Sequence, residues 1–162
     1  MTPEQAFLVL QTFEGGDKVT TNPNDAGGTT KWGFSQAAYP NVDIVNLTKE
    51  TALAMFVTDY WNKGDCVKLK PELQYVHADS CFNMGIETAN KILQRAANIL
   101  DDGIFGSQTL VQSDNVSIEA YLLQREWDDD SIVVHRQSQI VFLGGWENRN
   151  KTILSLWRSG KL

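Results

Sequence analysis

Residues 14–33 read EGGDKVTTNPNDAGGTTKWG, and this stretch decides the fold. It contains five glycines, at positions 15, 16, 27, 28 and 33, around the run Asn22-Pro23-Asn24-Asp25. Glycine, asparagine, aspartate and proline favour tight turns, and glycine adopts the positive φ angles that hairpin turns need. The stretch therefore predicts a glycine-rich β hairpin, and helices are expected on both sides of it.

The segment before this stretch has the pattern of an amphipathic helix. Thr2 is suited to cap it, Pro3 to begin it, and Gln5 to complete a capping box. Apolar residues at helical spacing predict a helix over residues 3–13, which Gly15-Gly16 ends. Glu14 then falls in the last turn, where a carboxylate faces the negative pole of the helix dipole. Helix stability does not explain an acid at this place.

The remainder of the chain is predicted to be mostly helical. Apolar spacing predicts helices over residues 48–61, 72–84, 87–100, 107–112, 117–127, 131–143 and 146–157. The acidic run Asp128-Asp129-Asp130 is interpreted as a solvated loop or the start of a helix. The predicted fold class is thus α+β and mostly α, with one small β element.

Composition limits the possible functions. The chain has 162 residues, 42% of them hydrophobic and 21% charged, which is typical of one globular domain. Its net charge of −6 argues against a nucleic-acid partner. No apolar run is long enough to span a bilayer, and the first residues do not have the pattern of a secretory signal. We expect no membrane insertion, and a cytoplasmic location at synthesis.

Cysteine and histidine give little indication of a metal site or a cofactor. Cys66 and Cys81 are too few for a disulfide framework, although a bridge between them stays open. His77 and Cys81 lie four residues apart and are able to share one helix face as ligands. The chain has only two histidines and no second ligand pair at usable spacing. No metal and no cofactor are therefore predicted.

Carboxylate chemistry is the remaining catalytic possibility. No serine-nucleophile elbow, phosphate loop or dinucleotide fingerprint is present. Glu14 is followed, within the hairpin, by Asp25 and Thr30. Glycoside hydrolysis needs one acid to protonate the leaving oxygen, and a second polar group to hold water or stabilise a cation. The alternative is that Glu14 is a solvated helix-end acid and Asp25 a turn residue bonded to its own backbone.

The block from Glu14-Gly15-Gly16 to Trp32-Gly33 resembles the amino-terminal signature of glycoside hydrolase family 108, which includes bacteriophage N-acetylmuramidases. The order Glu, Asp, Thr also resembles that of phage lysozymes of the T4 type. Later stretches follow the family's order. They are Tyr60-Trp61, Asp79 to Gly85, Leu93-Gln94, Asp102 to Thr109, and Gly145 to Arg149. One departure is Asp17, where the family has an aromatic residue.

The resemblance implies a lysozyme-like single domain. Residues 1–88 would form the catalytic lobe, and residues 89–162 a helical lobe that resembles a peptidoglycan-binding module and packs with the first as one globular unit. Glu14 would be the general acid, with Asp25 and Thr30 holding or activating water.

Several other residues in these stretches have a possible role in the site or in the fold. Trp32 is suited either to stack on a sugar ring or to pack on the core. Asn83 is suited to donate its amide to the substrate. The Asp102 to Gly106 segment is interpreted as a tight turn with Ser107 as a helix cap, and Trp146 as a packed residue beside a salt-bridged Arg149.

The implied function is hydrolysis of the β-1,4 bond between N-acetylmuramic acid and N-acetylglucosamine in bacterial peptidoglycan. A phage endolysin of this kind would be made in the host cytoplasm and would act as a monomer in the periplasm or cell wall. It would depend on a holin-type partner to permeabilise the membrane. The alternative function, from a different class, is a non-catalytic peptidoglycan-binding or phage structural protein with the same fold.

Overall fold

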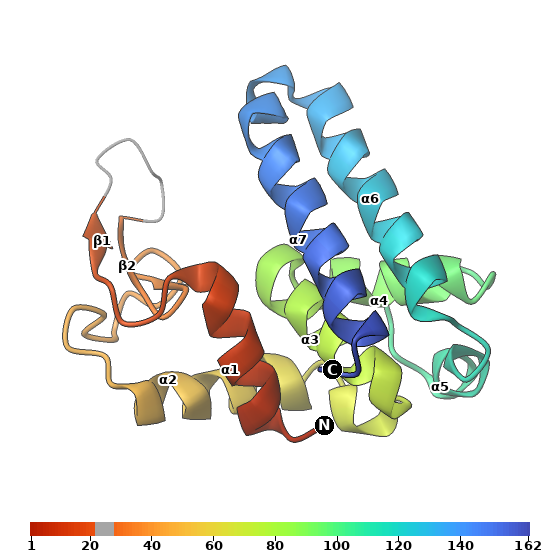
Figure 1. The fold of residues 1–162 in the computed structure, drawn as a ribbon, viewed down its shortest axis with the longest axis horizontal. Coiled ribbons are helices and arrows are strands. Elements are labelled where there is room, and N and C mark those ends of the chain that lie inside the picture. Colours follow the sequence, from red (N-terminus) through yellow and green to blue (C-terminus); the bar gives the residue numbers. More distant parts are fainter. Residues whose placement is uncertain (22–27) are drawn as a thin grey trace. The chain divides into compact units, whose positions relative to one another are not determined.

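The computed structural model describes residues 1–21 and 28–162, which form two compact units (Figure 1). The N-terminal unit consists of Thr2–Asp59, and the C-terminal unit of Tyr60–Leu162 together with Met1. This boundary is a structural one. The division at residue 88 into a catalytic and a peptidoglycan-binding lobe stays a prediction.

The N-terminal unit begins with the predicted helix, α1 (Pro3–Glu14). The capping box is confirmed, because Thr2 Oγ1 accepts from the Gln5 amide and Gln5 Oε1 accepts from the Thr2 amide. The helix ends at Gly15, whose φ of 79° is the left-handed conformation that favours glycine. The helix therefore reaches one residue beyond the predicted end and includes Glu14 in its last turn.

A small antiparallel sheet follows, in the order β1-β2-β3. Its strands are β1 (Thr20–Thr21), β2 (Thr29–Lys31) and β3 (Phe34–Ser35). Thr30 lies opposite Thr20 on one side and Ser35 on the other. Trp32 and Gly33, with φ of 55° and 78°, form the two-residue connection between β2 and β3. The predicted glycine-rich hairpin region is confirmed for the residues that the structure describes.

The N-terminal unit is completed by α2 (Lys49–Phe56), which Thr48 caps. The π-helical turn η1 (Val57–Asn62) continues from it into the C-terminal unit. Phe7 of α1 packs on Phe56 of α2, with ring centroids 5.6 Å apart. The apolar core of this unit contains Ala6, Phe7, Leu10, Phe34, Ile44, Leu47, Ala52 and Phe56.

The C-terminal unit is helical and is built around α3 (Pro71–Met84). All nine residues from Leu73 to Cys81 are buried, so α3 is covered on every side. The other elements are η2 (Cys66–Lys68), α4 (Ile86–Ala96), α5 (Ser107–Ser113), α6 (Ile118–His135), η3 (Gln137–Gln139) and α7 (Ile140–Arg158). Helices α6 and α7 form a long hairpin (Figure 1). No helix in the described part of the chain is long and apolar enough to cross a membrane.

Two predictions about this hairpin were wrong. Asp128-Asp129-Asp130 lies inside α6 rather than in a loop, and Gly144-Gly145 lies inside α7 rather than between two helices. The acidic run is tolerated because two of its members have partners. Asp128 pairs with Arg95, and Asp129 accepts from Asn150 Nδ2 over 3.3 Å. The chain reverses at residues 136–139 instead.

Candidate active site

Glu14 lies at the C-terminal end of α1 and is half-buried. Its last turn holds no basic residue that would offset the helix dipole. Gly15 and Gly16, with φ of 79° and 65°, turn the chain sharply away from the helix axis. The Glu14 carboxylate thus lies at the end of the helix, and the backbone changes direction immediately after it.

The end of α1 is tied to the β2–β3 connection by backbone hydrogen bonds. The Trp32 amide donates to the Gly16 carbonyl over 2.9 Å, and Gln11 Nε2 donates to the Trp32 carbonyl over 3.2 Å. Gly16 and Gln11 flank Glu14 in the sequence. These bonds fix the β2–β3 connection beside the end of α1, where Glu14 lies.

Thr30 is the middle residue of β2 and is half-buried. Trp32 directly follows β2, and its amide bonds to Gly16 in the loop after Glu14. The C-terminal end of β2 is therefore held to that loop. The structure therefore brings Glu14 and Thr30 into one unit, on elements that are hydrogen-bonded to each other. Asp25 lies in the segment 22–27, outside the described residues.

Trp32 packs on the core of the N-terminal unit. Its ring centroid is 6.3 Å from that of Phe7, and its Nε1 donates to the Leu47 carbonyl over 3.2 Å. The core-packing interpretation is therefore confirmed. The ring is still only half-buried, and stacking on a sugar stays a prediction.

Asn83 lies in the C-terminal unit, exposed on the last turn of α3. Its Nδ2 donates to the Asp79 carbonyl over 2.8 Å, so one amide hydrogen is engaged within its own helix. The carbonyl oxygen of the side chain has no part in this bond. A substrate contact through Asn83 stays a prediction.

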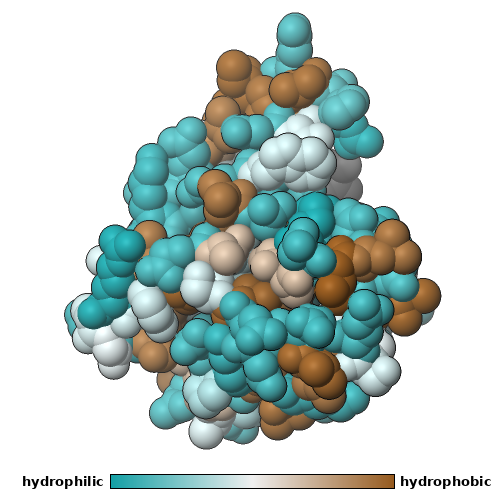
Figure 2. Space-filling view, turned by 90° about the vertical axis from the view of Figure 1, so that its right-hand side faces the viewer, coloured by the Kyte–Doolittle hydropathy of each residue, from teal (hydrophilic) through white to brown (hydrophobic). Residues whose placement is uncertain are grey.

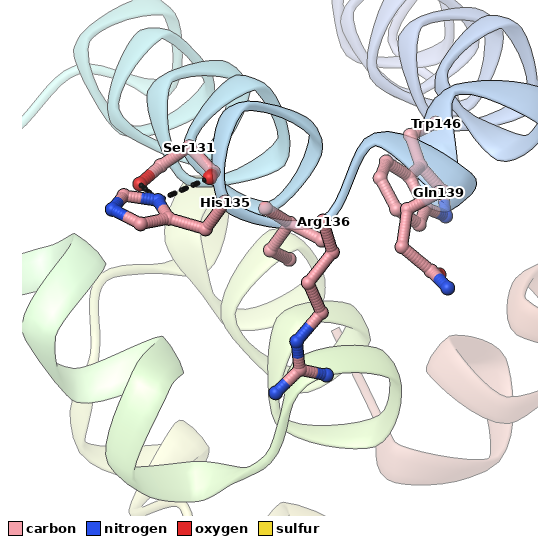
Figure 3. Close-up of a pocket in the computed structure, with 6 residues that line it drawn as sticks. Ser131, His135, Arg136, Gln139 and Trp146 are labelled. Atoms are coloured by element: carbon pink, nitrogen blue, oxygen red, sulfur yellow. Dashed lines mark hydrogen bonds between the residues drawn. The ribbon is translucent and has the colours of Figure 1, made fainter.

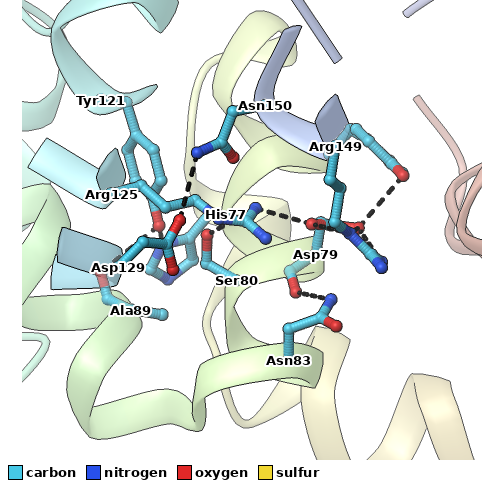
Figure 4. A network of polar contacts seen from close by, with 11 residues as sticks. His77, Asp79, Ser80, Asn83, Ala89, Tyr121, Arg125, Asp129, Arg149 and Asn150 are labelled. Carbon is cyan, nitrogen blue, oxygen red and sulfur yellow. Dashed lines mark hydrogen bonds and ion pairs between the residues drawn. The ribbon is translucent and has the colours of Figure 1, made fainter. Parts of the chain in front are cut away.

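Asp79 is the centre of a buried ion network that sequence reasoning missed (Figure 4). Arg125 Nη1 donates to Asp79 Oδ2 over 2.6 Å, and Arg149 Nη2 donates to Oδ1 over 2.7 Å. Burial raises the pKa of Asp79, but the two guanidinium groups outweigh it and hold the pKa below its usual range. The network joins α3, α6 and α7, and it confirms the salt-bridged interpretation of Arg149.

Gln94 of α4 organises the loop from Asp102 to Gly106, which leads into α5. Gln94 Nε2 donates to Asp102 Oδ1 over 2.7 Å and to the Ile104 carbonyl over 3.0 Å, and Gln94 Oε1 accepts from the Gly103 amide over 2.8 Å. Gly103 has a φ of 78°, as a tight turn requires. The turn is confirmed. Ser107 is not the helix cap, because Gly106 occupies that position.

A hollow of about 440 Å³ lies at the closed end of the α6–α7 hairpin (Figure 3). It is lined by Ser131, Ile132, His135, Arg136, Gln139 and Trp146. Exposed apolar residues, among them Val134, Val141 and Phe142, gather at the same end of the hairpin, at the top of Figure 2. None of the predicted site residues lines this hollow.

The comparisons with known proteins agree with the sequence resemblance. The family Glycosyl hydrolase 108 matches residues 7–85, a range that contains Glu14, Thr30, Trp32 and Asn83. The fold is similar to the solved structure of Brucella abortus SagA, with a TM-score of 0.82 and 23% identity over 98% of this chain and 95% of that one. No curated protein matches the sequence. The resemblance to glycoside hydrolase family 108 is therefore confirmed over residues 7–85, on a mostly α, lysozyme-like α+β fold.

Proposed function

We propose that this protein is an N-acetylmuramidase that cleaves the β-1,4 bond between N-acetylmuramic acid and N-acetylglucosamine in bacterial peptidoglycan. The family match supports glycoside hydrolase activity, and it covers the segment that contains Glu14. The observation that carries the proposal is the placement of Glu14. Glu14 is a half-buried acid at the end of α1. The loop that follows it accepts a hydrogen bond at Gly16 from Trp32, in the connection between β2 and β3.

In this mechanism Glu14 donates its proton to the glycosidic oxygen as the bond to the departing sugar breaks. The positive charge that develops on the other sugar is stabilised by a nearby carboxylate, or removed by attack of an activated water. Asp25 and Thr30 are the proposed groups for that second task. Asp25 is the stronger candidate, because its carboxylate is able to carry the negative charge that stabilises a cation, whereas the Thr30 hydroxyl is neutral.

A different class of function is a peptidoglycan-binding protein without turnover. The net charge of −6 is the sequence argument for this alternative, because peptidoglycan carboxylates repel an acidic enzyme at long range, but the same repulsion would weaken binding without turnover. The two functions predict the same affinity for the polymer. They differ in whether new sugar ends are formed.

Analysis of the digestion products distinguishes these functions. Purified peptidoglycan is incubated with the protein, reduced with borohydride and hydrolysed to single sugars. The proposal predicts reduced N-acetylmuramic acid as the new end group. Reduced N-acetylglucosamine would reassign the cleaved bond, and binding without new ends would favour the non-catalytic alternative.

The proposed biological role is that of a phage endolysin, made in the cytoplasm and released to the cell wall by a holin-type partner. Expression in bacteria should leave cells intact until the inner membrane is permeabilised. Lysis without any permeabilising agent or partner would contradict this role. It would not bear on the bond that is cleaved.

A further inference from the structure

Three side chains with metal-binding atoms lie together in the interior of the C-terminal unit. They are Cys66, His77 and Cys81, and one ligand atom of each lies within 4.8 Å of the other two. All three residues are completely buried, and both cysteines are free thiols. The proposed hydrolytic mechanism uses none of them.

The fold brings these residues together from two elements. His77 and Cys81 lie four residues apart on α3, a spacing that places them on the same face of the helix. Cys66 is the first residue of η2, which packs against α3. Sequence spacing indicated the first pair, but the third member comes from outside the helix. For this reason no metal site was predicted.

Gly64 lets the backbone approach the two sulfur atoms more closely than any other residue would allow. A Cβ added at this position would lie 2.7 Å from Cys81 Sγ and 3.3 Å from Cys66 Sγ. The Gly64 carbonyl oxygen is 3.1 Å from His77 Nε2. The same residue therefore adjoins both thiols and one ring nitrogen, which places Nε2 on the sulfur side of the imidazole.

The other ring nitrogen of His77 has a partner of its own (Figure 4). Nδ1 lies 3.0 Å from the Tyr121 hydroxyl, and that hydroxyl lies 3.4 Å from the Ala89 carbonyl oxygen. The Gly64 carbonyl oxygen only accepts, so without metal the neutral ring donates from Nε2–H to Gly64 and accepts at Nδ1 from the Tyr121 hydroxyl. Metal binding at Nε2 would move the ring proton to Nδ1, from which it would be donated to the Tyr121 oxygen. Metal-binding histidines typically have such an outer partner on the nitrogen that does not bind the metal.

We propose that Cys66, His77 and Cys81 bind one Zn²⁺ ion that links η2 to α3. Thiolate and imidazole are the ligands that zinc prefers in proteins. Binding exchanges two thiol protons for one divalent cation, so the charge of the buried site does not change. A neutral site avoids the large cost of burying an isolated charge. The proposed fourth ligand is the Gly64 carbonyl oxygen, which lies 3.1 Å from His77 Nε2.

The direct test is mass spectrometry of the full-length reduced protein under non-denaturing conditions, after removal of metal and addition of one equivalent of Zn²⁺. The proposal predicts a mass gain of one zinc atom less two protons. No retained zinc would overturn it. A loss of two protons without metal, which indicates a disulfide between Cys66 and Cys81, would also overturn it.

Cobalt identifies the ligands. Co²⁺ added to the metal-free protein should give sulfur-to-metal charge-transfer absorption and the visible bands of a tetrahedral site, and Zn²⁺ should abolish both. Cys66→Ser and Cys81→Ser should each weaken the charge-transfer band, and Tyr121→Phe should lower zinc affinity about 10- to 100-fold.

His77→Gln should lose the visible bands, whereas His135→Gln, at the chain's other histidine, should retain them. Unchanged spectra in folded cysteine variants would overturn the assignment, and the zinc mass measurement on the unaltered protein decides the matter if those variants do not fold.

Discussion

Asp79 and Arg149 lie 70 residues apart in the sequence, yet Arg149 Nη2 donates to Asp79 Oδ1 over 2.7 Å and Arg149 Nε donates to Oδ2 over 3.0 Å. The two bonds form a bidentate pair, the geometry in which arginine binds carboxylates most specifically. Arg125 donates to the same carboxylate from α6. One buried acid in α3 thus holds two helices of the α6–α7 hairpin.

Asp79→Ala should lower the free energy of unfolding by about 3–5 kcal/mol, because it leaves two guanidinium groups without their carboxylate in the interior. The matched control is Glu147→Ala, which removes the acid of the exposed Glu147–Lys151 pair in α7. That change should cost less than about 1 kcal/mol. Urea denaturation measures both, and similar losses for the two variants would show that the buried network is not a main source of stability.

Asp129→Asn should stabilise the protein at neutral pH. Burial raises the pKa of Asp129 to about 6, so the folded state holds a proton on this group that the unfolded state has already released. Its contribution to stability therefore falls as the pH rises from about 4 to about 6. The variant should be more stable than the unaltered protein by about 1–3 kcal/mol at pH 7, and nearly equal to it at pH 3.

Chemical denaturation at several pH values tests this prediction. Asp130→Asn is the control, since Asp130 is the exposed neighbour in the same helix. It should change the pH profile much less. A difference between Asp129→Asn and the unaltered protein that does not depend on pH would contradict the assignment to the Asp129 carboxyl.

Gln94→Leu should release the loop between α4 and α5. The substitution introduces an apolar side chain of similar size and leaves the Gly103 amide and the Ile104 carbonyl without the bonds that Gln94 provides. The expected loss is about 1–3 kcal/mol. Hydrogen exchange of the Gly103 amide should become faster, whereas Gln108→Leu, at an exposed position of α5, should leave it unchanged. Unaltered protection of Gly103 in Gln94→Leu would contradict this role.

The local features of the fold were predictable from the sequence. The capping box at Thr2, the helix end at Gly15 and the glycine-rich hairpin region depend on residues that are adjacent or a few positions apart. Short-range backbone chemistry decides such features. The same is true of the glycine turn at Gly103.

Features that depend on distant partners were not predictable in this way. Asp129 is typical of a loop until Asn150 and Arg125 are known to lie beside it, because these partners offset part of the cost of burying a charge in a helix. Cys66 likewise joins His77 and Cys81 only through the packing of η2 on α3. The proposed catalytic residues fall between these cases. The family resemblance of the Glu14 to Gly33 block indicated a glycosidase, while the placement of Glu14 and Thr30 depends on the bonds between Trp32, Gly16 and Gln11.

The central claim is that Glu14 is the general acid, and the rate of release of new reducing ends from purified peptidoglycan tests it most directly. Glu14→Gln retains the shape of the side chain and removes the transferable proton. The control is Glu4→Gln, at the exposed acid in the first turn of the same helix. Glu14→Gln should remain folded, bind peptidoglycan and lose about 10²–10⁴ in rate, while Glu4→Gln stays near the unaltered rate. Turnover by folded Glu14→Gln at the unaltered rate would contradict the role of Glu14 and the mechanism proposed for this protein.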